Sequence, residues 1–76
     1  MRILPPGGKI MTLSELLQDK TLYYSLAEHE INSKDMAFVS EETTESRIYY
    51  IYEVYGVDVI IIWDIKTEKV AQVEYV

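Results

Sequence analysis

The chain has 76 residues, of which 49% are hydrophobic, and it contains no cysteine. This length predicts one small domain, and the missing cysteines exclude disulfides, thiolate chemistry and cysteine-based zinc sites. Thirteen acidic residues against seven basic residues give a net charge of −6, a sign that argues against direct nucleic-acid binding and favours a protein partner with a basic surface.

Residues 1–10 are expected to form an N-terminal arm ahead of a single domain that spans residues 11–76. Two prolines and two glycines at positions 5–8 interrupt the short apolar run of this arm, so it lacks the long apolar segment of a secretory signal. No part of the sequence reaches the roughly 18 uninterrupted apolar residues that a membrane-spanning helix needs. We therefore expect a soluble cytoplasmic protein with no membrane partner.

A helix is predicted from Leu13 to about His29. Thr12 and Glu15 have the spacing of a capping box at its start. The helical period places one apolar stripe on the core side, made of Leu13, Leu16, Leu17, Tyr23, Tyr24, Ala27 and Ile31. Leu22 and Leu26 fall on the opposite side, which leaves two alternatives: a break near residues 19–21 rotates the second half, or these leucines contact a second surface.

His29 is the only soft metal ligand in the chain, and it stands between Glu28 and Glu30. Consecutive residues of a helix point to different sides, so these three side chains cannot converge on one ion. We expect no metal and no cofactor, and we interpret His29 as an exposed residue at a helix end, where its charge favours the macrodipole.

Apolar and β-branched runs predict strands at residues 36–40, 47–55, 57–64 and 69–75. The acidic, Ser/Thr-rich run at residues 41–46 predicts a solvated loop. Residues 47–76 hold five of the seven tyrosines and the only tryptophan. The expected fold class is α+β, with one N-terminal amphipathic helix packed on a three- to four-stranded antiparallel β-meander.

The first hairpin is predicted to turn at Gly56 and Val57, with Gly56 in the positive-φ region. This register pairs Val54 with Val59, Tyr52 with Ile61, and Tyr50 with Trp63. The second hairpin is less constrained by its sequence. A four-residue loop would turn Gln72 and Glu74 onto the apolar face, so we expect a three-residue loop with a left-handed bulge residue around Thr67 or Glu68.

This register divides the sheet into two faces. The expected core face consists of Tyr50, Tyr52, Val54, Val57, Val59, Ile61, Trp63, Ala71, Val73 and Tyr75. The opposite face carries the apolar residues Tyr49, Ile51, Tyr55, Ile60, Ile62, Val70 and Val76 among the polar residues Glu53, Asp58, Asp64, Gln72 and Glu74. Ordinary solvent-facing sheets are more polar than this second face.

The second face is the predicted partner-binding site, formed by Tyr49, Ile51, Glu53, Tyr55, Asp58, Ile60, Ile62 and Asp64. Its apolar residues would anchor a partner, and its carboxylates would steer association. One helix cannot cover both sides of a sheet. Three explanations of the face remain open: cover by the N-terminal arm or mere β-propensity, contact with a second copy of the chain, and contact with a foreign protein.

The segment IIIWDIKTEKV, residues 60–70, resembles the Trp-Asp hairpin of WD-repeat propeller blades. A propeller needs several such blades of about 40 residues, and the sequence has no internal repeat. The Trp-Asp pair is therefore interpreted as a strand end at which Asp64 bonds its own turn.

In size, acidity and lack of catalytic motifs, the chain is similar to the small inhibitors that phages and mobile elements direct against host nucleic-acid enzymes, such as anti-CRISPR proteins and uracil-DNA glycosylase inhibitors. That resemblance implies a small acidic, non-enzymatic interaction module, an inhibitor or adaptor that docks on a basic surface of a nucleic-acid-handling protein. The alternative is a structural homodimer. No nucleophile–base spacing supports an enzyme.

Overall fold

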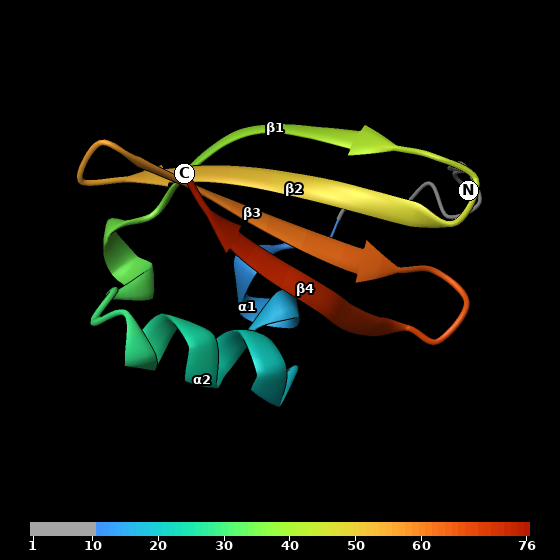
Figure 1. Cartoon of the computed structure of the whole chain (residues 1–76), viewed down its shortest axis with the longest axis horizontal. Coiled ribbons are helices and arrows are strands. Elements are labelled where there is room, and N and C mark those ends of the chain that lie inside the picture. The colour runs from blue at the N-terminus through green and yellow to red at the C-terminus, as the bar shows by residue number, and fades with distance from the viewer. Residues whose placement is uncertain (1–10) are drawn as a thin grey trace.

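The sheet is a four-stranded antiparallel meander in which the strands follow one another in chain order. The computed structural model describes residues 11–76, so the predicted N-terminal arm lies outside the described residues. The strands are β1 (Ala37–Thr43), β2 (Arg47–Val54), β3 (Val57–Asp64) and β4 (Lys69–Tyr75). They follow helix α1 (Leu13–Leu16), helix α2 (Lys20–Glu28) and the 3-10 helix η1 (Ser33–Asp35). Both α-helices lie on one face of the sheet (Figure 1), and the expected α+β class with a β-meander is confirmed.

The prediction of one continuous helix over residues 13–29 is wrong, because the chain turns between α1 and α2. The capping box is present at the start of α1, where the Glu15 N–H donates to Thr12 Oγ1 at 3.2 Å and the Thr12 N–H donates to Glu15 Oε1 at 2.9 Å. Asp19 then caps α2, since its Oδ1 accepts the Thr21 N–H at 2.9 Å. An aspartate at this position satisfies a backbone donor that the helix itself cannot pair.

The break between the two helices determines which residues reach the core. Leu16, Leu22 and Leu26 are buried, as the first of the two alternatives requires. Tyr23 and Tyr24 remain 57% and 62% exposed, so their predicted place on the core stripe is wrong. Ala27 is exposed as well, while Leu13, Leu17 and Ile31 pack at the margin of the core.

The core lies between the helices and one face of the sheet. Its buried residues are Leu16, Leu22, Leu26, Ile48, Tyr50, Tyr52, Val54, Val59, Ile61 and Val70. On β2 these are alternate residues, as the two-residue period of a strand requires. Tyr50 is fully buried, and its hydroxyl accepts the Met11 N–H at 3.2 Å, so the one polar atom of this large side chain is hydrogen-bonded.

The first hairpin turns one residue earlier than predicted, at Tyr55 and Gly56, which have φ values of 54° and 78°. Two positive φ values are typical of a type I′ turn, whose twist matches that of the flanking strands. Val57 therefore pairs with Val54, Tyr52 with Val59, and Tyr50 with Ile61. The predicted pairs are each wrong by two residues, but a shift of two leaves every side chain on its predicted face.

The second hairpin reaches the expected faces by a different route. Asp64 pairs with Lys69, which leaves a loop of four residues, and Glu68 ends that loop with a φ of 57°. The predicted three-residue loop is therefore wrong, although the left-handed residue is one of the two expected. A bulge restores the alternation, because Ile62 pairs with Gln72 whereas Trp63 pairs with Val70.

The bulge exchanges the predicted places of two residues in β4. Val70 is buried in the core and Ala71 is exposed, the reverse of the prediction. Val73 and Tyr75 stay on the helix side, as expected. The Val70 N–H donates to Asp19 Oδ2 at 2.8 Å, so one carboxylate caps α2 and also holds the start of β4.

The first strand is longer than predicted. It extends to Thr43 and includes Glu41 and Glu42, which were assigned to a solvated loop. Those two acids therefore have fixed positions on the sheet. A register shift between Phe38 and Ser40 leaves Val39 as an extra residue, and such bulges are common on edge strands.

Candidate protein-binding site

The face of the sheet opposite the helices, hereafter the outer face, has an apolar centre. Its residues follow from the strand register: Tyr49 lies opposite Ile62, and Ile51 lies opposite Ile60. Tyr49, Ile51 and Ile60 are each partly exposed. Ile62 is only 4% exposed, yet it does not belong to the buried core cluster. The outer face therefore offers three partly exposed apolar side chains beside one that is already buried.

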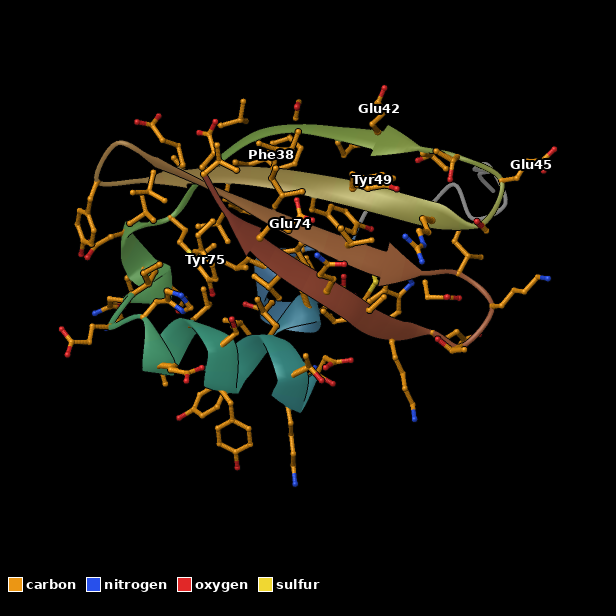
Figure 2. All side chains as sticks on the ribbon, viewed as in Figure 1. Phe38, Glu42, Glu45, Tyr49, Glu74 and Tyr75 are labelled. Atoms are coloured by element: carbon orange, nitrogen blue, oxygen red, sulfur yellow. The ribbon has the colours of Figure 1, made fainter. Side chains whose placement is uncertain are left out.

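Acidic side chains surround this apolar centre on three sides. On one flank, Glu42 of β1 lies opposite Tyr49, and on the other, Glu74 of β4 lies opposite Ile60. Glu53 and Asp58 lie opposite each other at the hairpin end, and all four side chains are exposed. Figure 2 shows Glu42 pointing away from the helices, whereas Tyr75 of β4 points toward α2.

The remaining side of the outer face is mixed in charge. Arg47 lies opposite Asp64, which in turn lies opposite Lys69. The outer face is thus polarised along its strands, from two acids at one end to two bases and one acid at the other. The charge of the outer face therefore changes along the strands, from negative at the hairpin end to mixed at the opposite end.

Two of the predicted binding residues have local structural roles. Tyr55 is a turn residue, 70% exposed, and its hydroxyl donates to Asp35 of η1. This hydrogen bond raises the pKa of the Tyr55 hydroxyl, because the carboxylate favours the protonated phenol. Asp64 Oδ1 accepts the N–H groups of Lys66 and Thr67 at 2.9 and 3.1 Å, which confirms that it bonds its own turn.

Asp64 and the other six predicted residues share the outer face, whereas Tyr55 lies in the turn. Tyr49, Ile51, Glu53, Asp58, Ile60 and Ile62 come from the central strands β2 and β3. The sequence prediction missed Glu42, because the first strand was ended before it. Glu42 pairs with Tyr49 and Glu41 pairs with Tyr50. These pairs can be assigned only if β1 is known to continue to Thr43.

A polar cluster on the helix side joins α2 to β4. Ser25 Oγ and the Tyr75 hydroxyl are 2.6 Å apart, and the His29 ring stacks on the Tyr75 ring with centroids 3.8 Å apart. His29 Nδ1 lies 3.0 Å from the backbone carbonyl oxygen of Ser25. Activation of a serine needs a base within reach of its hydroxyl. Here His29 Nδ1 contacts the backbone carbonyl of Ser25 and not its hydroxyl. We therefore interpret the cluster as a structural contact between α2 and β4. The sequence prediction missed this cluster, because its members are up to 50 positions apart.

A hollow of about 230 Å³ opens beside the helices. It is lined by Leu17, Tyr23, Leu26, Ala27, Ile31, Asn32 and Ser33. This volume is smaller than the roughly 300–1,000 Å³ of typical small-molecule sites. The Asn32 side chain is already engaged, because its Oδ1 accepts the Lys34 N–H at 2.9 Å.

Tyr50 and Tyr52 have perturbed hydroxyls in the core. Burial raises the pKa of both phenols, and the charges of Glu41 and Glu15 add to the rise for Tyr50. The Met11 N–H opposes the rise at Tyr50, since it stabilises the phenolate. Both groups lie in the packed core, so these shifts are a consequence of packing.

Within residues 11–76, no group of three or more His, Cys, Asp and Glu side chains is arranged to hold a metal ion. In the same part of the chain, no helix has the length and apolarity to cross a membrane.

Comparison with known proteins gives no match among protein-family models, curated proteins or solved structures.

Proposed function

We propose that the protein is a small, non-enzymatic interaction module whose outer face binds a basic surface of another protein. One observation carries the proposal: the helices cover one face of the sheet, while Tyr49, Ile51 and Ile60 remain partly exposed on the other, with carboxylates on three sides of them. Protein interfaces have this layout, with an apolar and aromatic centre and a polar rim.

The acidic pair at the hairpin end supports a basic partner. Glu53 and Asp58 are direct cross-strand neighbours, and both are exposed. Like charges directly opposite each other destabilise a strand pair. A lysine or arginine of a partner would relieve that repulsion, so binding would favour a cation at this end of the outer face.

The chemistry of the face narrows the class of partner. Basic protein surfaces are typical of proteins that handle nucleic acids, because they bind phosphate. An acidic module docked on such a surface would inhibit the protein or act as its adaptor. Tyr49, Ile51 and Ile60 would anchor the contact, and Glu42, Glu53, Asp58 and Glu74 would speed association and set its orientation.

The test is a quantitative pull-down from lysate of the source cells with the immobilised protein. A variant that combines Ile51→Ala with Ile60→Ala should retain the specific partner at least about tenfold less well, as expected for loss of interface anchors. The matched control combines Tyr23→Ala with Tyr24→Ala, which removes two exposed rings from α2. Equal retention by both variants, or retention that does not fall as salt rises, would contradict the proposal.

A homodimer is the second candidate, favoured by the direction of the charge pattern. When two outer faces stack with their strands antiparallel, the end bearing Glu53 and Asp58 meets the end bearing Arg47 and Lys69 of the second copy. Such stacking of sheets is a common architecture. Sedimentation at tens of micromolar, an order typical of micromolar affinities, would show a dimer that Ile51→Ala with Ile60→Ala dissociates. A monomer at that concentration would contradict this second candidate.

A further inference from the structure

The two edges of the sheet differ in how their backbone is protected. At the β4 edge, α2 packs alongside, Asp19 accepts the Val70 N–H, and Ser25 contacts Tyr75. Within residues 11–76, β1 pairs with β2 alone, and six of its seven side chains are exposed. The exposed residues include Phe38 and Val39, which are 52% and 54% exposed. Among the described residues, the backbone edge of β1 that faces away from β2 therefore has no strand partner.

The register shows which groups of β1 point outward. The Thr44 N–H donates to the Arg47 carbonyl at 2.8 Å, and antiparallel ladders alternate between bonded and non-bonded pairs. Glu42 and Tyr49 therefore form the next bonded pair, whereas the backbone groups of Thr43 and Glu41 face away from β2. These two residues present the donors and acceptors that an added strand would pair with.

The side chains of this edge select the kind of strand that fits. Glu41 and Glu42 project to opposite faces of the sheet, since they pair with Tyr50 and Tyr49. Phe38 stands on the same face as Glu41, with its ring edge-to-face on Tyr52 at 5.5 Å between centroids. A second copy added antiparallel, with Glu41 opposite Thr43, would set Glu42 against the Glu42 of that copy, which disfavours self-pairing.

We propose that the edge of β1 binds an extended, basic segment of a partner protein by strand addition. Two consecutive Lys or Arg residues of that segment, one on each face, would meet Glu41 and Glu42, and an apolar residue would cover Phe38. Backbone hydrogen bonds supply affinity in this mode, and alternate side chains supply specificity. The site shares Glu42 with the outer face but is built on the backbone edge of β1, so neither proposal depends on the other.

The first test uses two blocked synthetic peptides that alternate threonine and valine and differ only at their centre, Lys-Lys in one and Glu-Glu in the other. In the protein without peptide, the Glu41 and Thr43 amides should exchange rapidly with solvent. Saturating Lys-Lys peptide should slow both amides by at least about tenfold, because local protection follows hydrogen bonding. The Glu-Glu peptide should leave them unchanged.

A matched pair of variants tests the backbone contact. Thr43→Pro deletes an outward N–H that the β1–β2 ladder does not use, a position where an edge strand tolerates proline. Thr43→Val keeps the N–H and, like proline, loses the hydroxyl bond to Glu41. Thr43→Pro should weaken binding of the Lys-Lys peptide about tenfold, the loss expected for one hydrogen bond in a small interface, while Thr43→Val should bind like the native chain.

A charge reversal keeps the proposal testable if Thr43→Pro does not fold. The variant combining Glu41→Lys with Glu42→Lys should reverse the preference and bind the Glu-Glu peptide, whereas Glu28→Lys with Glu30→Lys, the same change of charge at the end of α2, should not.

The proposal is overturned if neither peptide binds, if both peptides bind equally, or if Glu41 and Thr43 are already protected without peptide. Protection without peptide would show that residues 1–10 or a second copy occupies the edge, and sedimentation distinguishes these two. The variant that combines Ile51→Ala with Ile60→Ala should bind the Lys-Lys peptide as the native chain does. A negative result with the peptides would therefore contradict strand addition and not the proposed function of the outer face.

Discussion

The two faces of the sheet are built from alternate residues of the same strands and have similar apolar centres, but they differ in cover. β2 and β3 place Tyr50 and Ile61 against the helices, where both are fully buried. The neighbouring residues Tyr49 and Ile60 lie on the outer face and stay partly exposed. Apolar composition alone does not distinguish these faces. Only the position of the helix layer makes one a core and leaves the other available for contact.

The largest expected effect comes from a pair of adjacent isoleucines, one on each face. Ile61→Ala should lower the free energy of unfolding by about 2–5 kcal/mol, because it leaves a cavity in the packed core. Ile60→Ala should cost about 1 kcal/mol, since its side chain is already partly in water. Urea denaturation of both variants measures the difference. Equal losses would show that the outer face is as tightly packed as the core, which would contradict the proposed difference between the two faces.

Asp19 tests how the helix layer is held on its face. Its carboxylate accepts the N–H groups of Thr21 and Val70. Asp19→Ala should therefore cost about 2 kcal/mol, as loss of a helix cap combined with an unpaired backbone donor. Asp19→Asn keeps an acceptor and should cost less. If thermal unfolding shows the same loss for both variants, the hydrogen bonds do not fix α2 to β4.

Replacement of Glu68 tests the conformation of the loop between β3 and β4. It should change the free energy of unfolding by less than Asp19→Ala does, and it should stabilise the protein. With φ at 57°, a residue other than glycine is strained. Glu68→Gly should raise the free energy of unfolding by about 0.5–1 kcal/mol. The control, Lys69→Gly, places glycine in a strand and should destabilise. A loss of stability in Glu68→Gly would contradict the assigned loop conformation.

The buried tyrosines of the covered face predict a pH dependence limited to alkaline solution. Burial raises the pKa of Tyr50 and Tyr52 above the ordinary value of 10.0. The unfolded chain therefore loses these protons at a lower pH than the folded chain does. The contribution to stability is full below pH 10 and is lost as the pH rises from there through the folded pKa values. Denaturation midpoints measured between pH 8 and about 11 should fall only at the alkaline end, and less steeply in Tyr52→Phe.

Several elements were predictable because their signals are local. The capping box at Thr12 and Glu15, the strands from β2 onward, and the turn-bonding role of Asp64 each depend on residues close in sequence. Which residues of β2 and β3 face the core was also predictable. A shift of the register by one residue would turn charged side chains into the core, which is unfavourable.

The remaining features depend on contacts between distant residues. The bulge at Ala71 and the burial of Val70 accompany a hydrogen bond to Asp19, which is 51 positions away. The helical period left the break near residues 19–21 as one of two alternatives, and the structure selects it; the contact of Asp19 with β4 has no local signal. The extension of β1 through Glu41 and Glu42 requires pairing with β2, which overrides the low strand propensity of these residues. For the candidate site, seven of the eight residues share the outer face, although Asp64 also bonds its own turn, and Tyr55 lies in the turn and bonds Asp35.

The most direct test of the outer face is an isoleucine-methyl NMR spectrum of the protein, recorded alone and then saturated with the partner retained in the pull-down. β2 and β3 carry isoleucines on both faces, so one spectrum contains its own control. We predict that the Ile51 and Ile60 methyl signals shift or broaden on binding, while those of Ile48 and Ile61 do not. A saturated complex in which Ile51 and Ile60 are unchanged would contradict the assignment of the outer face as the binding surface.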